Sequence, residues 1–375
     1  MRNLSDWSII EVTQNCCVLF FCEKDLGGGE CEVKVKLSYV ARVLSGVRPG
    51  ALMGSISTAR SNCGWSGPRL FFDMLWCAAR YGAGYHDYVM FHFYELTGKQ
   101  RDTYVTRLKN KRLVTLVNDP KAAELFDRKT LFYPLFKEYL GRDYLIVSET
   151  DREELARFLK GRETVFAKPD VGESGKGIER IRVSDFATAE GMLMYLEKKG
   201  LSLVEEELTQ HPDMGRLYPG SANTMRVVTL LTGGPGHWQA NCVYAVVKMG
   251  TGGKAVDNLE NGGLFCPIDR STGRICGVGH KSDLTTRTHH PDTGVELIGY
   301  KIPYVEEAIE LCKKAALVEP RMRYLGWDVC ITPDGPVIVE GNDYPGYDFW
   351  QQPEHTPDRI GLWPTYQKLI PELRT

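Results

Sequence analysis

The spacing of apolar and polar residues divides the chain into a helical first part and a mixed second part. Between Leu70 and Leu116 the apolar residues recur with a helical period, which predicts helical structure. From Leu208 onward, strand-like segments dominate. One helix is expected in that last part, with Pro303 in its first turn and the following apolar stripe: Val305, Ala308, Ile309, Cys312 and Ala316.

The middle of the chain alternates between strand-like and helix-like spacing of its apolar residues. A strand is expected over 164–168, followed by a glycine loop over 170–177 and a second strand around 178–183. A helix over 184–200 and a strand over 201–205 complete the segment. Strand, loop, strand, helix and strand within so short a span predict a compact α+β lid.

Two helix starts are predicted from capping residues. Thr150, with Glu153 three positions later, has the capping-box form, and Gly161 is expected to end that helix. Upstream, the sequence Asn118-Asp119-Pro120 predicts a helix cap followed by proline in the first turn.

These elements predict an α+β fold with three parts. Residues 1–116 form a partly helical N-terminal region, whose first 60 or so residues carry no readable motif. Residues 117–207 form the lid, and residues 208–375 form a strand-rich core that carries the metal site.

Composition and charge narrow the function classes. The 375 residues have a formal net charge of -2, which gives no support for nucleic-acid binding. The longest apolar runs, such as Cys16 to Cys22, are far shorter than the roughly 20 residues that span a bilayer. Asp6 and Glu11 interrupt any signal-peptide core, and the 11 scattered cysteines include no C-x-x-C pair. A cytoplasmic protein with reduced thiols is expected.

A glycine loop follows the strand that ends at Lys168. Gly172, Gly175 and Gly177 leave backbone N–H groups free to approach phosphate oxygens, and Lys168 and Lys176 supply countercharge. The loop is not a Walker A motif, since no Ser or Thr follows Lys176. A flexible hairpin with solvated lysines is the alternative. The lysine at the strand end favours phosphate binding, because its ammonium group can point at the phosphates that the loop covers.

A hairpin near the C-terminus predicts a metal site. Pro333-Asp334-Gly335 fits a three-residue loop that pairs Thr332 with Pro336, and counting back places Asp328 opposite Glu340. Asn342 follows two positions along the same face. Two carboxylates and an amide oxygen suit the Mg²⁺ of a bound nucleotide. The alternative is a polar stripe on an edge hairpin. The run 337–339 disfavours it, because three consecutive apolar residues indicate a strand buried on both faces.

One arginine stands near the start of another predicted strand, Met225 to Leu231. The planar guanidinium of Arg226 suits the oxygens of a phosphoryl group or an acyl phosphate. A surface salt bridge is the commoner role for an arginine considered alone.

Taken together and in this order, the motifs resemble the ATP-grasp superfamily, and within it the sugar-transfer-associated ATP-grasp family. The resemblance extends from about residue 70 to residue 350. It rests on six segments: Lys168-Pro169 with its glycine loop, Val204 to Leu208, Ser221 to Thr229, Asp257-Asn258 with Gly262-Gly263, His290 to Gly294, and Gly326-Trp327-Asp328 with Glu340-Gly341-Asn342.

The resemblance implies ATP held between two α+β lobes, with specific residues in specific roles. Lys129 and Lys168 match the lysines that contact ATP phosphates, and Arg226 matches the arginine near the γ-phosphate. Lys248 also matches a residue of that region, where relatives often carry arginine. The remaining matches are the lid residues Gly172, Ser174, Gly175, Lys176 and Gly177, the hinge residues Glu206 and Leu208, Asp213 at the ribose, Asn223 and Asp257 nearby, and the metal ligands Asp328, Glu340 and Asn342.

The implied activity is an ATP-dependent ligase that joins a carboxylate to an amine or a thiol through an acyl phosphate. Its partners would be a small-molecule or peptide carboxylate and its acceptor, in the biosynthesis of a glycan, a peptide or another metabolite. Two alternatives stay open: a kinase that uses the same ATP and Mg²⁺ site on a hydroxyl acceptor, and a non-catalytic nucleotide-binding module. The sequence does not determine the oligomeric state.

Overall fold

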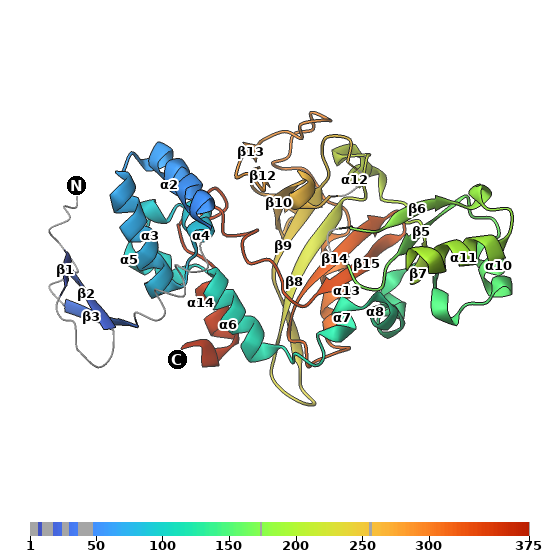
Figure 1. Cartoon of the computed structure of the whole chain (residues 1–375), viewed down its shortest axis with the longest axis horizontal. Coiled ribbons are helices and arrows are strands. Elements are labelled where there is room, and N and C mark those ends of the chain that lie inside the picture. The colour runs from blue at the N-terminus through green and yellow to red at the C-terminus, as the bar shows by residue number, and fades with distance from the viewer. Residues whose placement is uncertain are drawn as a thin grey trace. The chain divides into compact units, whose positions relative to one another are not determined.

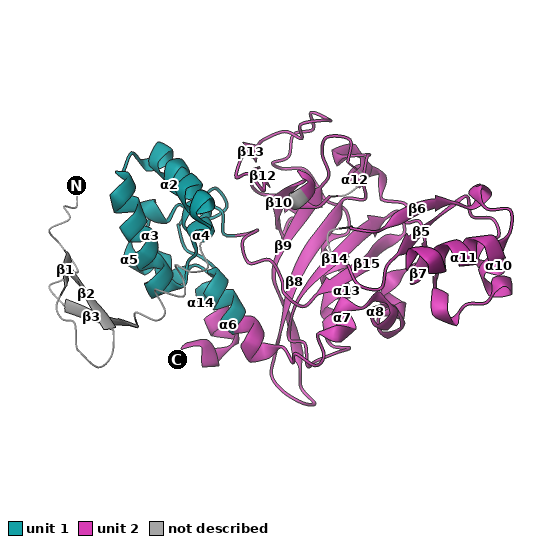
Figure 2. Ribbon diagram, viewed as in Figure 1, with its two compact units in different colours: residues 1–112, 351–364 teal, residues 113–350, 365–375 magenta. Residues whose placement is uncertain are grey.

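The computed structural model describes residues 48–172, 175–254 and 257–374, together with the backbones of three N-terminal strands. These strands, β1 (Trp7–Ile9), β2 (Val18–Lys24) and β3 (Glu30–Lys36), form an antiparallel sheet. The chain divides into two compact units (Figure 2): unit 1 contains 1–112 and 351–364, and unit 2 contains 113–350 and 365–375. The mixture of helices and sheets confirms the α+β class (Figure 1).

The described part of unit 1 is helical, as the pattern between Leu70 and Leu116 predicts. A half-buried ion pair joins two of its helices, since both guanidinium Nη atoms of Arg101 donate to the Asp73 carboxylate at 2.7–2.8 Å. Its elements are α2 (Pro49–Cys63), α3 (Gly67–Tyr81), α4 (Tyr85–Met90), η2 (Phe93–Glu95) and α5 (Gly98–Thr103), and α6 (Arg107–Val117) continues into unit 2.

The first sheet of unit 2 confirms the predicted strand, loop, strand, helix and strand. Its strands lie in the order β4-β7-β5-β6, and helices α10 and α11 bury their apolar faces on it. The elements are β4 (Tyr144–Ile146), η3 (Val147–Glu149), α10 (Arg152–Leu159), β5 (Thr164–Lys168), β6 (Glu179–Arg182), η4 (Val183–Asp185), α11 (Ala189–Lys199) and β7 (Leu203–Glu206).

Three helix starts in this region differ from the prediction. Helix α11 begins at Ala189 after its cap Thr188, not at 184, where the short helix η4 lies instead. Asp151, not Thr150, caps α10, because its carboxylate accepts from the backbone N–H groups of Glu153 and Glu154 at 2.9 and 2.8 Å. Asn118 caps no helix. Its side-chain amide nitrogen instead donates to the carbonyl oxygens of Tyr324 and Asp343 at 2.9 and 3.0 Å, so it ties α6 to the second sheet of unit 2.

The second sheet has eight antiparallel strands and contains the core of unit 2. Their order is β13-β12-β10-β9-β8-β14-β15, with β11 paired to β10. The strands are β8 (Thr224–Thr232), β9 (Gln239–Met249), β10 (Leu264–Asp269), β11 (Arg274–Ile275), β12 (Gly279–Lys281), β13 (Thr286–Arg287), β14 (Tyr324–Thr332) and β15 (Gly335–Asn342).

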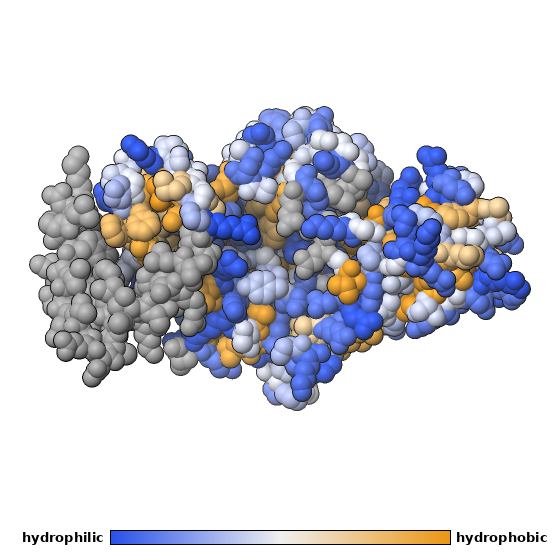
Figure 3. Space-filling model, in the orientation of Figure 1, coloured by the Kyte–Doolittle hydropathy of each residue, from blue (hydrophilic) through white to orange (hydrophobic). Residues whose placement is uncertain are grey.

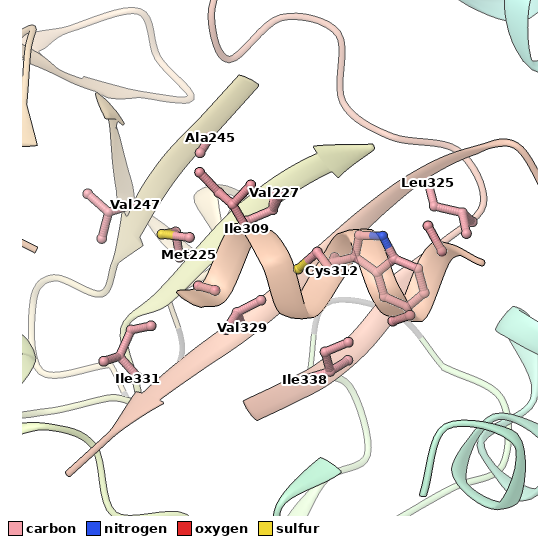
Figure 4. Packing of buried hydrophobic residues seen from close by; sticks show 14 of the residues in the cluster. Met225, Val227, Ala245, Val247, Ile309, Cys312, Leu325, Val329, Ile331 and Ile338 are labelled. Carbon is pink, nitrogen blue, oxygen red and sulfur yellow. The ribbon is translucent and has the colours of Figure 1, made fainter. Parts of the chain in front are cut away.

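Helix α13 (Val305–Ala316) covers one face of this sheet and confirms the predicted apolar stripe. Residues such as Met225, Val227 and Val329 point from the strands toward the helix (Figure 4). Pro303 precedes the helix, whose N-cap is Tyr304, and does not lie in the first turn. Shorter elements complete unit 2: α7 (Glu124–Asp127), α8 (Lys129–Leu135), α9 (Lys137–Leu140), α12 (Pro212–Leu217), η5 (Leu259–Asn261), α14 (Trp363–Leu369) and η6 (Pro371–Arg374), where α14 begins in unit 1.

The β14–β15 hairpin reaches the predicted pairing by a different route. Thr332 pairs with Gly335, so the loop has two residues and not three, but a β-bulge beyond Val329 restores the pairing of Asp328 with Glu340. The expectation of a strand buried on both faces is wrong, since β15 is the edge strand of the sheet and only Ile338 in its apolar run is fully buried. An edge strand also accommodates Pro336, which lacks a backbone donor.

On the coloured part of the face in Figure 3, most of the surface is polar, with apolar side chains exposed over α2 and α3 and around α10 and α11. Met53, Phe72 and Met194 are among the exposed large apolar residues. Isolated exposed residues of this kind are ordinary on globular proteins. Within the described ranges, no helix combines the length and the hydropathy that crossing a membrane requires.

Candidate functional site

The face of the large sheet opposite α13 carries the predicted catalytic and metal-binding residues. Asp328 on β14 pairs with Glu340 on one side and with Arg226 on the other. Lys248 on β9 pairs with Thr224, two residues before Arg226 on β8. Because directly paired residues share a face, four charged side chains from four strands lie on one surface.

Asp328 lies at the centre of a buried ion cluster. Its Oδ1 accepts from Arg226 Nε at 2.6 Å, and its Oδ2 accepts from Arg226 Nη2 and Lys248 Nζ, both at 2.9 Å. Burial alone would raise the pKa of Asp328, but the two cations outweigh it and hold the pKa well below its usual range. The Asp328 carboxylate is therefore ionised at neutral pH.

Glu340 is the one carboxylate of this cluster that solvent reaches. A side-chain hydrogen bond joins it to Asp328. Although the side chain reaches solvent, the surrounding protein partly desolvates its carboxylate, and this desolvation, followed by the charge of Asp328, raises the pKa of Glu340. Two carboxylates in contact need a proton or a metal cation between them. Asn342, two residues further, donates from Nδ2 to the carbonyl oxygen of Gly326 at 3.2 Å, so it borders the same pair.

This donor set fits the Mg²⁺ that accompanies a nucleotide. Within the described residues, no three His, Cys, Asp or Glu side chains form a metal-binding group. Two adjoining carboxylates are suited to a cation that keeps most of its coordination for phosphate and water oxygens, as Mg²⁺ does.

A second buried ion cluster lies in the first sheet, around Glu205 of β7. Lys168 Nζ lies 2.5 Å from Glu205 Oε1, and Arg142 Nε donates to Oε2 at 2.8 Å. The Tyr133 hydroxyl also donates to Oε2. Burial alone would raise the pKa of Glu205, but Lys168 and Arg142 lower it to about 2. Two cations around one carboxylate leave this cluster with one net positive charge.

Lys129 connects the two clusters electrostatically. Burial lowers its pKa, and the charges of Glu340, Lys168 and Glu205 all act on it. Its Nζ donates to the carbonyl oxygen of Gly172 at 3.2 Å. Lys129 therefore lies at the start of the glycine loop and within electrostatic reach of both clusters.

Asp170 fixes the glycine loop to the start of α8. Its carboxylate accepts from Arg128 Nε at 2.7 Å and from the backbone N–H of Thr130 at 2.9 Å. Gly175 and Gly177 have φ of +74° and +76°, a region that favours glycine. Lys176 is exposed at the loop surface, and Ser174 lies outside the described residues.

The predicted hinge follows β7. The backbone N–H of Glu206 donates to the carbonyl oxygen of Asp143 at 3.0 Å, and Leu208 lies two residues beyond the strand. Asp213 lies in the first turn of α12, 3.3 Å from Arg216. Among the described residues, no hydrogen bond or ion pair joins Glu206, Leu208 or Asp213 to either ion cluster.

Two further predicted residues are engaged within the protein. Asn223 is fully buried, and its Nδ2 donates to the carbonyl oxygens of Met214 and Tyr218 at 2.7 and 2.8 Å. The Asp257 carboxylate accepts from the backbone N–H of Thr224 at 3.0 Å and also from its hydroxyl. Both side chains thus support the start of β8, just before Arg226.

Aromatic rings border the polar face next to Arg226. Phe349 lies 5.9 Å from the Arg226 guanidinium and 4.9 Å from the ring of Phe265, which pairs with Lys248. The Tyr244 hydroxyl donates to the carbonyl oxygen of Gly346. The segment that follows β15 is thereby held against β9 and β10.

The sequence prediction assigned no role to Tyr133, Arg142 or Glu205, although Glu205 lies within one of the six matched segments. A carboxylate directly after the apolar pair Leu203-Val204 is the signal that could have revealed Glu205, because a charged residue inside a buried strand requires a cationic partner. No comparable signal marks Arg142, which lies in a loop between α9 and β4.

Comparison with known proteins places the chain in a family. No curated protein matches it. Similar solved structures include the ATP-grasp ligase PsnB with a minimal precursor, at 15% identity over 72% of each chain and a TM-score of 0.39. D-alanyl-alanine synthetase A from Vibrio cholerae O1 biovar eltor has 13% identity over 68% of this chain and 67% of its own, also with a TM-score of 0.39. D-cycloserine synthetase DcsG has 11% identity over 69% and 77%, with the same TM-score of 0.39.

At these TM-scores the solved structures carry no residue-level correspondence. The family profile described as sugar-transfer associated ATP-grasp, however, matches residues 108–356, about two thirds of the chain. The chain belongs to the sugar-transfer associated ATP-grasp family.

Proposed function

We propose that this protein is an ATP-dependent ligase that activates a carboxylate as an acyl phosphate and transfers the acyl group to an amine or a thiol. The observation that carries the proposal is the pair of ion clusters, around Glu205 and around Asp328, with Lys129 in electrostatic reach of both. Two lysines and an arginine that approach carboxylates from separate sheets form a surface suited to a polyphosphate with a divalent cation.

The charge balance of the clusters favours an anion. The Glu205 cluster has one positive charge in excess, because Lys168 and Arg142 surround a single carboxylate. Buried charge of one sign is costly until a counterion neutralises it. A triphosphate would neutralise Lys129 and Lys168, and the lid glycines would close over it.

Each predicted residue receives a role in this proposal. Lys129, Lys168 and the loop over 172–177 would hold the phosphates, while the backbone at Glu206 and Leu208 would pair with adenine and Asp213 would bind the ribose. Asn223 and Asp257 would hold the start of β8 and thereby keep Arg226 in place. Asp328, Glu340 and Asn342 would hold Mg²⁺, which draws charge from the phosphate oxygens as the terminal phosphoryl group is transferred.

The reaction would proceed in two balanced steps. A carboxylate oxygen of the substrate attacks the γ-phosphorus and ADP leaves, while Arg226 and Lys248 stabilise the charge that develops on the phosphoryl oxygens. The amine or thiol then attacks the carbonyl carbon, the phosphate leaves with the bonding electron pair, and the nucleophile loses its proton. The aromatic border of Phe265 and Phe349 would exclude water, which otherwise hydrolyses the acyl phosphate.

A trapping assay tests this proposal. The protein is incubated with Mg²⁺-ATP, hydroxylamine and a panel of amino acids, peptides and sugar acids, and ADP and hydroxamate are measured. Because hydroxylamine attacks an acyl phosphate, ADP and hydroxamate are expected to appear in equal amounts with the correct carboxylate. Asp328→Asn and Lys168→Met serve as controls and are expected to abolish both products.

Two other outcomes would contradict the ligase. ADP release that depends on a hydroxyl acceptor and gives no hydroxamate would indicate a kinase. Nucleotide binding without turnover on any panel member, together with unaltered biological activity of the Asp328→Asn variant, would indicate a non-catalytic module.

A further inference from the structure

Arg142 is a fully engaged buried arginine that the proposed reaction does not use. Its side chain is about 1% exposed, and it lies in the turn between α9 and β4. Beside its bond to Glu205, it donates from Nη1 to the carbonyl oxygens of Ile338 at 2.8 Å and Leu140 at 3.0 Å. From Nη2 it donates to the Tyr133 hydroxyl at 2.8 Å and to the carbonyl oxygen of Val339 at 3.4 Å.

The two β15 carbonyl groups belong to the bulge that sets the position of Glu340. Ile338 pairs with Val329 and Glu340 pairs with Asp328, so Val339 is the extra residue. A bulge removes backbone groups from the ladder and leaves them in need of other partners. Arg142 is the hydrogen-bond donor for two such groups, the carbonyl oxygens of Ile338 and Val339.

The backbone of the turn is fitted to the same strand. Gly141 has φ of +58°, and a Cβ added there would lie 2.2 Å from Val337 Cγ1. Glycine at this position therefore permits both the left-handed conformation and the close approach that brings Arg142 to β15.

We propose that Arg142 is a positioning residue that links the phosphate-binding lysine to the metal-binding carboxylate. On one side it holds Glu205, which in turn holds Lys168 at 2.5 Å. On the other it holds the bulge that aligns Glu340 with Asp328. Through Arg142 the two sheets present the phosphate lysine and the carboxylate pair in fixed register, so that one Mg²⁺-nucleotide contacts both. The assignment rests on the proposed function, since it concerns the same nucleotide.

The test measures how much Mg²⁺ strengthens nucleotide binding. Affinity for the non-hydrolysable analogue AMPPNP is measured by calorimetry with excess Mg²⁺ and with a chelator, and the ratio of the two Kd values is the Mg²⁺ enhancement. In Arg142→Lys, the charge next to Glu205 is retained but the fork that reaches β15 is lost. We expect the enhancement to fall about tenfold, as for residues that orient metal ligands, while the metal-free Kd stays within about threefold of wild type.

Arg323→Lys is the matched control. Arg323 also donates from Nε to a strand carbonyl of the large sheet, that of Leu231 at 3.2 Å, but it has no contact with either ion cluster. Its enhancement is expected to equal that of the wild type. An unchanged enhancement in Arg142→Lys, or an equal loss in the metal-free and Mg²⁺ affinities, would assign Arg142 a purely structural role and overturn the proposal.

A second pair of variants decides the question if Arg142→Lys does not fold. Gly141→Ala pushes the turn away from Val337 and is expected to lower the enhancement in the same direction. Adding Val337→Ala removes the methyl group that clashes with the new side chain at position 141 and is expected to restore part of the Mg²⁺ enhancement. The backbone strain at position 141 is the same in the single and the double variant. Failure of the second change to restore any enhancement would overturn the proposal. No AMPPNP binding by the wild type in either condition would overturn the proposed function itself, and this assignment with it.

Discussion

The two ion clusters of unit 2 contain similar residues but differ in whether every carboxylate has a cationic partner within the protein. Around Glu205, one carboxylate is surrounded by Lys168, Arg142 and Tyr133, all buried. Around Asp328, two cations hold one carboxylate in the same way, but a second carboxylate, that of Glu340, adjoins it and is exposed to solvent. In the first cluster the one carboxylate is fully paired within the protein and one positive charge is in excess, whereas the second retains an acidic group whose partner comes from outside.

This difference separates stability from binding. The Glu205 cluster joins strands β5 and β7, helix α8 and the turn before β4, so its disruption is expected to affect folding first. The Asp328 cluster shares its charge between two carboxylates, so its residues are expected to affect ligand binding more than folding. The predictions that follow test this separation.

The largest expected effect on folding belongs to Glu205→Gln. This change leaves Lys168 and Arg142 buried without a counter-charge, and removing one partner of a buried pair costs about 3–5 kcal/mol. Chemical denaturation at pH 7 measures the loss. Glu207→Gln is the control, because Glu207 forms a more exposed pair with Arg180 and is expected to lose less than about 1 kcal/mol. Equal losses would contradict the account.

The same variant predicts a specific pH dependence. The pKa of Glu205 is lowered from 4.5 to about 2 in the folded protein. A lowered folded-state pKa stabilises the fold above the unfolded value, and this stabilisation is lost as pH falls from about 4.5 toward 2. Wild type and Glu205→Gln should therefore differ in the free energy of unfolding by a pH-dependent amount, which is about 3 kcal/mol at pH 7. This amount should shrink between pH 5 and 3. A difference that stays constant over that range would show that folding does not lower the pKa of Glu205.

Asp328→Asn is expected to destabilise less, by about 2 kcal/mol, although its carboxylate is equally buried. Glu340 adjoins the same position, and without Asp328 the repulsion that raises its pKa is removed. The pKa of Glu340 is then lower than in the wild type, and its carboxylate partly replaces the lost charge next to Arg226 and Lys248. The double variant Asp328→Asn/Glu340→Gln tests this directly, because it should lose more stability than the two single losses added together. Simple additivity would exclude the compensation.

The sequence predicted the elements better than it predicted their contacts. The strand Thr164–Lys168 and the buried stripe of α13 followed from local periodicity, and the structure confirms both. The cap at Asn118 was wrong, because local propensity cannot reveal a partner more than 200 residues away, such as the carbonyl of Tyr324. A tertiary hydrogen bond decided the conformation there.

The metal hairpin shows the same limit in another form. Its pairing of Asp328 with Glu340 was predicted from a loop one residue too long, and the bulge at Val339 compensates for that error. The bulge is supported by Arg142, which lies almost 200 residues earlier in the chain. Likewise, the sequence before Glu205 indicates that this carboxylate needs a cationic partner, but it does not reveal that Lys168 and Arg142 are the partners until the neighbouring strands are in place.

Thermal unfolding of wild type and Glu340→Gln, each with and without Mg²⁺-ATP, tests the central claim most directly. Because Glu340 is exposed, the substitution alone should change the free energy of unfolding by only about 0.5 kcal/mol. A ligand at 100 times its Kd stabilises the native state by about 2.7 kcal/mol, so the wild type should unfold at a higher temperature with Mg²⁺-ATP. The account predicts that this rise requires Mg²⁺ and is lost in Glu340→Gln. The same rise in both proteins, or none in the wild type at millimolar nucleotide, would contradict it.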